Sequence, residues 1–536
     1  MPYRIADRKE ARDVDRIAYE FYSLTELELM ENAGRASAHL AQQMAPSGAV
    51  LILCGTGNNG GDGFVAARYL AMDGREVHVA ALDMRATGKP RSKDAEANLR
   101  MLEGIGGGRL AVTEVSDPKG LEDAFAKAGE PALVIDALVG TGFHGEPQGL
   151  VKEAIDAINR AGRPVLAIDM PSGCPADGGP VPGSAVRADA TITFASPKAG
   201  NFSEPGAGLT GRLYVAPIGV PDGALEHITG ELIDIGLAGS YLPRRGRDAH
   251  KGDLGRVGIV AGSITMPGAA VLSAKGALRG GSGTVELFVP EEAYLPILGW
   301  GLLPECMIRP LPSSGGSFAG QLPDDAAEAL LSKDAVAFGP GIGRGPGAGA
   351  MFEAVMKLGL KKLVLDADAL WFAAGRPDLL QARRGGTMLT PHEGEMARLM
   401  PAPQGASRVA RAKECAAAFD SVVALKGPGT VVARPGGRYG IVNAGNPLMA
   451  TPGSGDVLTG LAVSVWGRSE SAYEALAAAA FLHSLAGDIA AATGAASILA
   501  GEIADRIPEA MAMALRAGET GARPEDAEYY EIRRAV

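Results

Sequence analysis

Short apolar runs alternate with amphipathic segments along the first half of the chain, and this alternation predicts its fold. The apolar runs lie at 50–54, 77–82, 133–135, 165–168, 191–194 and 213–215. Apolar residues at helical spacing indicate helices within 7–43, around 92–103 and over 151–161. Strands that alternate with helices form a parallel sheet covered on both faces. We therefore predict a Rossmann-like, doubly wound α/β domain.

The second half repeats this pattern with strands of its own. These predicted strands lie at 257–261, 285–289, 335–338, 363–365, 388–390, 422–425, 430–433 and 439–442. The last two indicate a hairpin across Gly436 and Gly437. Between the halves, residues 219–249 hold several prolines, glycines and arginines, which is typical of a linker. We predict two α/β domains, at 1–225 and 226–536, with no detectable sequence repeat between them.

The composition narrows the class of protein. Hydrophobic residues make up 46% and charged residues 21% of the chain, as in a globular protein. The net charge of −11 and the lack of a basic block make nucleic acid and anionic membranes poor partners. The four cysteines are scattered, so neither a zinc site nor a disulfide framework is indicated. The charged N-terminus and the lack of a clean apolar run of about 18 residues predict a cytoplasmic protein.

A glycine-rich loop, GTGNNGGDG at 55–63, follows the first predicted strand and precedes a predicted helix. Loop amides in this arrangement are free to hold a pyrophosphate. Asn58, Asn59 and Asp62 add polar side chains that could bind a ligand. A tight turn without a ligand is the alternative, but the order of the elements favours a ligand site.

Two later predicted strands end in aspartate. Asp136 and Asp169 each follow an apolar run, and Ser172 comes just after the second. Because ligands bind at the carboxyl ends of parallel strands, we expect Asn59, Asp136 and Ser172 to share one rim. Oxygen ligands of this kind suit a hard cation. Alternatively, each aspartate serves only as a cap or turn residue.

The stretch MATPGSGDVLTG at 449–460 carries the strongest chemical signal. Its glycines allow close approach of a ligand, and free amide groups at a helix start form an anion site. Asp456 beside that site could act as a base on a hydroxyl that meets a phosphoryl group. Alternatively, Ser454 and Asp456 are ordinary helix caps. The upstream KGPGT at 426–430 favours phosphate chemistry.

These motifs together resemble a known family. MENAGR, GTGNNGGDG, DALVGTG and DMPSG resemble the epimerase domain that acts on hydrated NAD(P)H. HKGDLGR, GPGIG, LDADAL, TPHEGE, KGPGT and GSGDVLTG resemble the dehydratase domain of the ribokinase-like superfamily. Their order is similar to that of the fused NAD(P)H-hydrate repair enzymes across nearly the whole chain. The resemblance implies that the first half interconverts the R and S hydrates of NADH and NADPH. It implies that the second half uses ADP, with Mg²⁺, to dehydrate the S form.

The resemblance also implies roles for individual residues. In the first domain, it assigns the hydrate to Asn58, Asn59, Gly60, Gly61, Asp62, Gly140, Thr141, Gly142, Phe143, His144, Gly145, Glu146 and Asp169. It assigns a potassium ion to Asn59, Asp136 and Ser172. In the second domain, it assigns the hydrate to Ala269, Gly343, His392 and Asp456. It assigns the nucleotide to Lys426, Gly427, Pro428, Gly429, Thr430 and Gly455. Trp371, Leu448 and Pro452 depart from the family pattern on the nucleotide side.

The candidate bases follow from these roles. Asp456 would take the proton of the hydroxyl that receives the phosphoryl group. For the epimerase, either Asp169 or Asp136 could shuttle the proton that opens and recloses the hydrated ring. If Asp136 holds potassium, Asp169 is the better candidate. We also expect the chain to self-associate.

Two other function classes compete with this interpretation. A ribokinase-like small-molecule kinase with a regulatory nucleotide-binding first half would use Asp456 equally well on a sugar hydroxyl. A non-catalytic scaffold, such as the RNA-decapping scaffold that shares the first half's fold, would carry basic or low-complexity tails. The chain has neither kind of tail, and it keeps Asp136 and Asp169, which argues against a scaffold.

Overall fold

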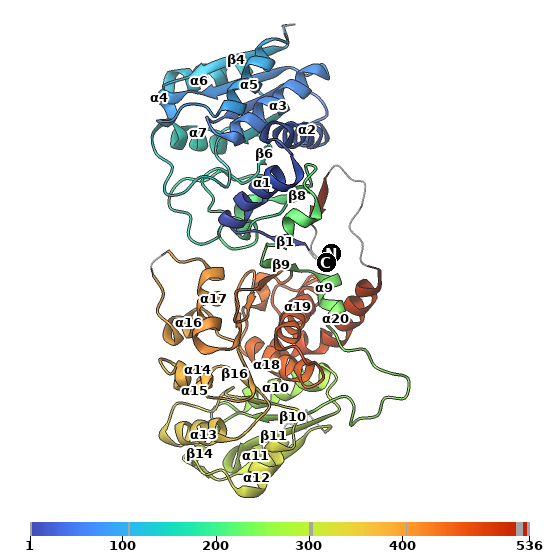
Figure 1. The fold of residues 1–536 in the computed structure, drawn as a ribbon. Coiled ribbons are helices and arrows are strands. Elements are labelled where there is room, and N and C mark those ends of the chain that lie inside the picture. The colour runs from blue at the N-terminus through green and yellow to red at the C-terminus, as the bar shows by residue number, and fades with distance from the viewer. Residues whose placement is uncertain (1–2, 106–107, 300–303, 404, 521–528, 533–536) are drawn as a thin grey trace. The chain divides into compact units, whose positions relative to one another are not determined.

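The computed structural model describes residues 3–105, 108–299, 304–403, 405–520 and 529–532 (Figure 1). By their contacts, these residues form two compact units, divided between Gly230 and Glu231. The sequence placed the domain boundary five residues earlier, after residue 225. A C-terminal strand, β21 (Tyr530–Ile532), belongs to the first unit, which the sequence did not indicate.

The first unit is built on a sheet with the order β21-β8-β7-β6-β5-β2-β3-β4. All neighbours pair in parallel except β21 and β8, which are antiparallel. Its strands are β2 (Val50–Cys54), β3 (Val77–Leu82), β4 (Leu110–Val115), β5 (Leu133–Ala137), β6 (Val165–Ile168), β7 (Ala190–Phe194) and β8 (Arg212–Ala216). The strand order reverses between β2 and β5. In doubly wound sheets this point is the usual ligand crevice.

Helices cover both faces of this sheet. One core packs residues of α2, α3 and α5 against the strands, and the other packs residues of α6 and α7. Capping boxes at Asp7 and Thr25 satisfy free amide groups where α1 and α2 begin. The helical segments are α1 (Arg8–Tyr22), α2 (Glu26–Met44), α3 (Asn58–Met72), α4 (Met84–Thr87), α5 (Lys93–Glu103), α6 (Pro118–Ala128), α7 (Gly149–Arg160), η1 (Ala199–Asn201), α8 (Gly206–Thr210) and η2 (Asp222–Leu225). A two-residue strand, β1 (Arg4–Ile5), precedes them.

The second unit has a sheet in which the strands follow the order β9-β20-β19-β18-β17-β16-β15-β10-β11-β12. Pairing is parallel from β18 to β12, whereas β18, β19 and β20 pair antiparallel, so the predicted hairpin is confirmed. The strand order reverses between β10 and β15. The strands are β9 (Gly230–Ile233), β10 (Arg256–Val260), β11 (Thr284–Pro290), β12 (Met307–Leu311), β15 (Ala335–Phe338), β16 (Lys362–Leu365), β17 (Gly386–Leu389), β18 (Val422–Leu425), β19 (Val431–Ala433) and β20 (Tyr439–Val442). A separate hairpin joins β13 (Ser313–Ser314) to β14 (Ser317–Phe318).

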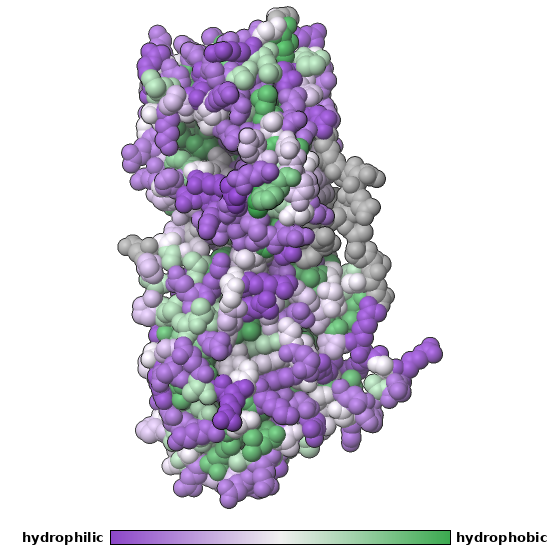
Figure 2. Space-filling model, viewed as in Figure 1, coloured by the Kyte–Doolittle hydropathy of each residue, from purple (hydrophilic) through white to green (hydrophobic). Residues whose placement is uncertain are grey.

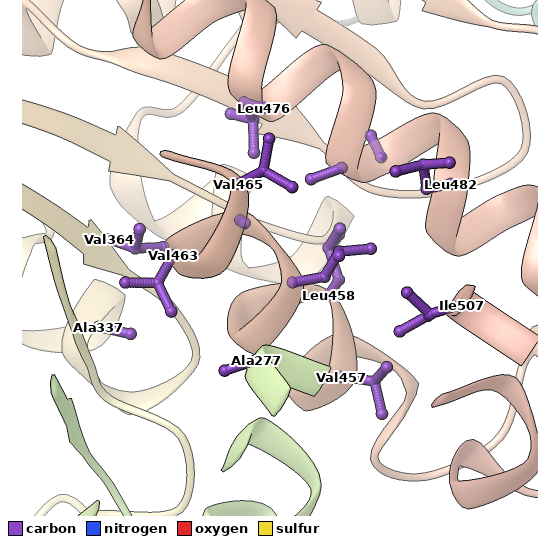
Figure 3. Close-up of a cluster of buried hydrophobic side chains, with 14 of the residues drawn as sticks. Ala277, Ala337, Val364, Val457, Leu458, Val463, Val465, Leu476, Leu482 and Ile507 are labelled. Carbon is purple, nitrogen blue, oxygen red and sulfur yellow. The ribbon is translucent and has the colours of Figure 1, made fainter. Parts of the chain in front are cut away.

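Helix α18 lies at the centre of the second unit's core. Figure 3 shows its Val457, Leu458, Val463 and Val465 among side chains of neighbouring helices and strands. A Cβ at Gly460 would collide with the Ser273 carbonyl oxygen, so glycine lets α10 approach α18 closely. The helical segments are α9 (Ile235–Ser240), α10 (Pro267–Arg279), α11 (Glu291–Gly299), α12 (Asp324–Leu331), α13 (Pro346–Lys357), α14 (Asp368–Ala373), α15 (Pro377–Gln381), α16 (Glu393–Leu399), α17 (Arg408–Phe419), η3 (Pro447–Met449), α18 (Ser454–Trp466), α19 (Ala472–Ala491) and α20 (Ala500–Thr520).

The region 219–249 is not simply a linker, so that interpretation was wrong. It contains η2, β9 and α9. The buried Glu231 carboxylate accepts hydrogen bonds from Tyr241, Tyr473 and Arg438 at 3.0, 2.8 and 2.7 Å. These bonds tie β9 into the second unit. The strand β9 was not predicted because it has only four residues and lies among prolines and glycines.

The visible surface is mostly hydrophilic, with a few hydrophobic groups (Figure 2). One such group lies at the lower end, where Figure 1 places α11 and α12, and Leu295, Leu298 and Leu331 are exposed there. Among the described helices, α19 alone is long and apolar enough to cross a membrane. However, 83% of its apolar window is buried inside the protein, which is typical of a core helix.

Candidate active sites

A cavity of about 610 Å³ lies in the first unit at the reversal between β2 and β5. Its wall includes residues of α1 and α2, the loops after β2 and β5, and the segment after β7. The sequence-predicted residues in its lining are Asn58, Asn59, Asp62, Gly140, Thr141, Gly142, Phe143 and Asp169. Helix α3 begins at Asn58, so its free first-turn amide groups lie at the cavity.

Five other predicted residues, Gly60, Gly61, His144, Gly145 and Glu146, lie outside this lining. The two glycines have a packing role, because a Cβ at either would clash. At Gly60 it would collide with the Gly55 carbonyl oxygen, and at Gly61 it would lie 2.5 Å from the Met30 sulfur. Contact of these five residues with a hydrate therefore stays a prediction.

Asp169 forms a buried ion pair with Lys198. The Lys198 Nζ lies 2.7 Å from Asp169 Oδ1, and the Thr141 amide donates to Oδ2 at 2.8 Å. Burial alone would raise the pKa of Asp169, but the Lys198 charge and these hydrogen bonds hold it below the ordinary value. Asp169 also has a left-handed backbone with φ of 65°, a strained conformation found often at functional sites. Lys198 was not predicted, although it follows the strand at 191–194.

Two further carboxyl groups line the same cavity, and their pKa values are raised, whereas that of Asp169 is lowered. Burial, together with the charge of Asp169, raises the pKa of Asp62 well above its ordinary value. Burial raises the pKa of Asp15 to about 6, and the Lys198 charge only partly offsets this. The cavity thus places the ionised Asp169 beside Asp62, whose raised pKa favours its protonated form, and beside Asp15, whose pKa of about 6 leaves it mostly ionised at neutral pH. Asp15 was missed because it lies on α1, where a charged residue resembles an ordinary solvated position.

Asp136 and Ser172 meet beneath the cavity. Ser172 Oγ donates to Asp136 Oδ1 at 2.6 Å, and the Ser172 amide donates to Oδ2 at 2.8 Å. Burial raises the pKa of Asp136 to about 6 despite these hydrogen bonds. Both residues are fully buried and lie outside the cavity lining. Of the two candidate bases for the epimerase, Asp136 and Asp169, Asp169 is therefore the one that lines the cavity.

The Asn59 amide provides a test of whether a cation fits here. Both its oxygen and its nitrogen are buried and have no hydrogen-bond partner in the described structure. A Cβ at Gly140 would lie 3.2 Å from Asn59 Oδ1 and 2.6 Å from Asp169 Oδ2, so both oxygens lie beside this loop. An unpaired buried amide is costly unless a further ligand satisfies it. An unpaired amide oxygen is a ligand that suits a hard monovalent cation. Within the described residues, no three His, Cys, Asp or Glu side chains group as a metal site.

In the second unit, the start of α18 places Asp456 in the first helical turn. The N-cap residue is Gly453, in a left-handed conformation with φ of 87°, and no side chain caps the helix. The alternative of Ser454 and Asp456 as caps is therefore wrong. In the described part of the chain, no hydrogen bond engages the Asp456 carboxylate. Burial and the nearby Asp366 charge raise its pKa to about 7, against the opposing effect of Lys426.

Lys426 lies beneath the start of α18. Its Nζ is 2.7 Å from Asp366 Oδ1 and 3.8 Å from Glu395 Oε2. Thr459 Oγ1 donates to Asp366 Oδ2 at 2.5 Å, which ties this group to α18. A Cβ at Gly455 would lie 3.2 Å from Lys426 Nζ, so glycine keeps space above the ammonium group. Asp366 and Glu395 lie in the motifs LDADAL and TPHEGE, but no role was predicted for either of them.

The remaining predicted residues lie on loops or helix starts that follow strands of the sheet. Gly343, with φ of 80°, follows β15, and its amide donates to Asp368 Oδ2 at 3.0 Å. Ala269 lies in the first turn of α10, and a Cβ at Gly341 would be 2.8 Å from its Cβ. His392 caps α16 by accepting from the Gly394 amide at 3.0 Å.

The predicted nucleotide loop turns sharply after β18. Gly427 and Gly429 have φ of 149° and 62°, and Thr430 Oγ1 donates to the Gly427 carbonyl at 3.0 Å. Gly427, Pro428, Gly429 and Thr430 are partly or fully exposed, so their polar groups are open to a ligand. This loop and the free amide groups of α18 can hold phosphate groups on either side of Lys426.

Comparison with known proteins finds matches to both units. A family profile described as "YjeF-related protein N-terminus" matches residues 26–200. A profile described as "NAD(P)H-hydrate dehydratase" matches residues 257–509. The protein called bifunctional NAD(P)H-hydrate repair enzyme in Moorella thermoacetica is 39% identical over 518 residues, which cover 93% of this chain and 95% of that protein. The protein of the same name in Escherichia coli is 32% identical, covering 92% of this chain and 90% of that protein.

A solved structure is similar to part of the chain. It is that of an ADP/ATP-dependent NAD(P)H-hydrate dehydratase from Bacillus subtilis, co-crystallised with ATP and Mg²⁺. The two are 30% identical, with a TM-score of 0.47. The match covers 53% of this chain and 98% of that structure.

Proposed function

The chain belongs to the family of bifunctional NAD(P)H-hydrate repair enzymes, and on this premise we propose which residues carry its two reactions. The family joins an epimerase for the R and S forms of hydrated NADH and NADPH to an ADP-dependent dehydratase. Membership sets aside the small-molecule kinase and the non-catalytic scaffold. The observation that carries the residue assignment is the Asp456 carboxylate, which has a pKa of about 7 and lies in the open first turn of α18.

For dehydration, we propose that Asp456 is the general base. A hydroxyl on the nicotinamide ring is a poor leaving group, and a phosphate ester is a good one. Asp456 removes the hydroxyl proton while the terminal phosphoryl group of ADP moves to that oxygen, which releases AMP. The C–O bond to phosphate then breaks as the ring nitrogen's lone pair forms a C=N bond. Loss of a proton from the neighbouring ring carbon to the released phosphate restores the reduced nicotinamide. A pKa near 7 suits a base that works at neutral pH.

The groups around Asp456 would stabilise the negative charge of the phosphate groups in this reaction. First-turn amides of α18, including that of Gly455, face the transferred phosphoryl group. Lys426, held by Asp366, and the loop Gly427–Thr430 contact the phosphates of the nucleotide. Mg²⁺ would arrive with the nucleotide and offset its negative charge. Ala269, Gly343 and His392 hold the hydrate on the facing side.

For epimerisation, we propose that Asp169 shuttles the proton. The pair with Lys198 keeps Asp169 ionised, so it can accept a proton from the hydrated ring. Lys198 stabilises the ionised form of Asp169 before the proton is taken up and after it is returned. Asp62, whose raised pKa favours its protonated form, can donate a hydrogen bond to the hydrate. The first-turn amides of α3, at Asn58 and Asn59, bind the pyrophosphate.

We also propose that potassium binds to Asn59, Asp136 and Ser172. The ion would satisfy the unpaired Asn59 amide oxygen and offset the buried charge of Asp136. The same residues fix the ends of β5 and β6, from which the Gly140 loop and Asp169 extend. Beyond the sites, we propose a self-associating cytoplasmic protein with small-molecule substrates and no nucleic-acid or membrane partner.

A repair assay tests this proposal. The protein is incubated with a mixture of R and S NADPH hydrates, Mg²⁺ and either ADP or ATP, and the absorbance of reduced nicotinamide is followed. We expect all of the hydrate to return to NADPH with ADP. Return of the S form alone would contradict the epimerase assignment. No return with either nucleotide would contradict the dehydratase assignment.

A further inference from the structure

An exposed tryptophan in the second unit lies against two arginines. The Trp371 side chain, on α14, is 44% exposed, which is unusual for so large an apolar group. The guanidinium carbon of Arg344 lies 4.7 Å from the ring centroid, and that of Arg398, on α16, lies 5.4 Å from it. The three residues come from separate segments of the chain. Folding therefore assembles a flat aromatic surface with two fixed cations.

We call Arg344, Trp371 and Arg398 the arginine–tryptophan cluster. One of its two arginines forms no ion pair among the described residues. Arg344 Nε donates to Asp368 Oδ1 at 2.9 Å. Arg398 has no carboxylate partner among the contacts of the described residues, and it is exposed. Its donors are therefore open to a ligand. An arginine that stacks on an aromatic ring loses little side-chain entropy when it binds a ligand. Its guanidinium group can then bind a phosphate through two parallel hydrogen bonds.

The cluster adjoins the proposed hydrate site of the dehydratase, whereas the resemblance set Trp371 on the nucleotide side. Arg344 directly follows Gly343, whose amide bonds the same Asp368 carboxylate as Arg344 does. The Asp368 charge also acts on the pKa of Asp456. Arg398 lies on the helix that begins after His392. A ligand that reaches Gly343 and His392 would extend over the cluster.

We propose that Arg398 and Arg344, oriented by Trp371, bind a phosphate group of the hydrated dinucleotide. This inference rests on the proposed dehydratase function and names the part of the substrate that the cluster recognises. Two sources of phosphate share this chemistry. One is the 2′-phosphate, present only in the NADPH hydrate, and the other is the pyrophosphate, present in both hydrates. In a simple structural role the arginines would only cover Trp371, and replacing Arg398 would then leave the KM for the hydrate unchanged.

The test uses full-length Arg398→Gln and Trp371→Leu proteins, with Trp371→Phe as the conservative variant. The kcat and KM for the pure S hydrates of NADPH and NADH are measured at saturating ADP, and the KM for ADP is measured separately. Loss of a charge-assisted hydrogen bond should raise the hydrate KM about tenfold, with kcat nearly unchanged. The hydrate KM of Trp371→Phe should lie closer to that of the wild type than the KM of Trp371→Leu does. A rise for the NADPH hydrate alone identifies the 2′-phosphate, and an equal rise for both identifies the pyrophosphate.

Arg506→Gln serves as the matched control. It removes a charge from α20, which carries none of the proposed site residues, and should leave every constant unchanged. Hydrate KM values within twofold of the wild type in a folded Arg398→Gln protein would overturn the proposal. A rise confined to the KM for ADP would also overturn it. Failure of the wild type to dehydrate either hydrate would instead contradict the proposed function, so the two failures are distinguishable.

Discussion

The Lys198 ammonium group lies 2.7 Å from Asp169 Oδ1, and both side chains are almost fully buried. Lys198 also donates to Thr193 Oγ1 at 2.8 Å. Removing one partner from a buried ion pair leaves an uncompensated charge, which costs about 3–5 kcal/mol. The pair therefore fixes the charge state of the cavity as well as its shape. This relationship leads to the first prediction.

Lys198→Met should slow epimerisation by about 10²–10⁴-fold, because Asp169 loses the charge that keeps it ionised. Asp169→Ala should have the same effect. In both variants, the pure S hydrate should still be dehydrated at the normal rate, since Asp456 lies in the other unit. The R hydrate should be repaired only as fast as it epimerises unaided. Separate assays of the two pure hydrates measure this.

Lys127→Met, which removes an exposed lysine of α6, is the control. Circular dichroism should show that Lys198→Met still folds. If it does not, the double variant Lys198→Met, Asp169→Asn removes the unpaired charge and should fold without epimerase activity. Near-normal epimerisation in either folded protein would remove Asp169 and Lys198 from the mechanism.

The second prediction concerns the cation. Because the proposed ligands are all oxygen atoms, epimerisation should require potassium and should survive zinc chelators. Replacing potassium with a bulky organic cation should slow the wild type markedly. Asp136→Ala should abolish the response to potassium, whereas Asp123→Ala, on the surface of α6, should keep it. An epimerase that works equally well in the organic cation would contradict the potassium assignment.

The third prediction concerns the division of the chain. Residues 1–230 and 231–536 should each give a folded protein with its own activity. A fragment that begins at residue 245 loses β9 and α9, and with them the Glu231 network. It should unfold at a lower temperature than the 231–536 fragment, as thermal denaturation would show. Equal unfolding temperatures would mean that β9 contributes little to the second unit.

The fourth prediction concerns pH. Asp456 must be ionised to accept a proton, so the kcat for dehydration should rise as the pH increases through about 7. The raised pKa also means that the folded protein binds this proton more tightly than the unfolded chain does. Stability from this group is therefore greatest at acidic pH and falls as the pH rises from about 4 to 7. Asp456→Asn should accordingly raise the unfolding temperature more at pH 8 than at pH 4. Equal shifts at both pH values would contradict the raised pKa.

Much of the fold follows from local patterns. The runs at 50–54 and 133–135, each followed by a polar loop, predicted β2 and β5, whereas the reversal of strand order between them was not predicted. The strand β21 could not be predicted in the same way. It has three residues, and its pairing with β8 joins segments about 300 residues apart along the chain. Only long-range packing selects such a strand.

The candidate sites also contain residues that the sequence predicted and residues that it did not. Asp456 and Asp169 lie in short motifs and were predicted as site residues, and the structure adds the burial and neighbouring charges that set the pKa of each. Lys198 and Asp15 carry no local signal, because their roles depend on burial beside Asp169. Gly60 was predicted to contact a ligand, but its lack of a side chain is explained by packing against Gly55. Sequence motifs locate the chemistry, and packing decides which motif residues face the ligand.

The most direct test of the account measures dehydration of the pure S hydrate of NADPH by wild type and Asp456→Asn, with saturating ADP and Mg²⁺. The substitution keeps the shape of the side chain and removes the base. We predict that kcat falls by at least about 10²-fold while ADP binds with unchanged affinity. The same variant should still interconvert the R and S hydrates. Near-normal dehydration by Asp456→Asn would show that Asp456 is not the base and would contradict the account.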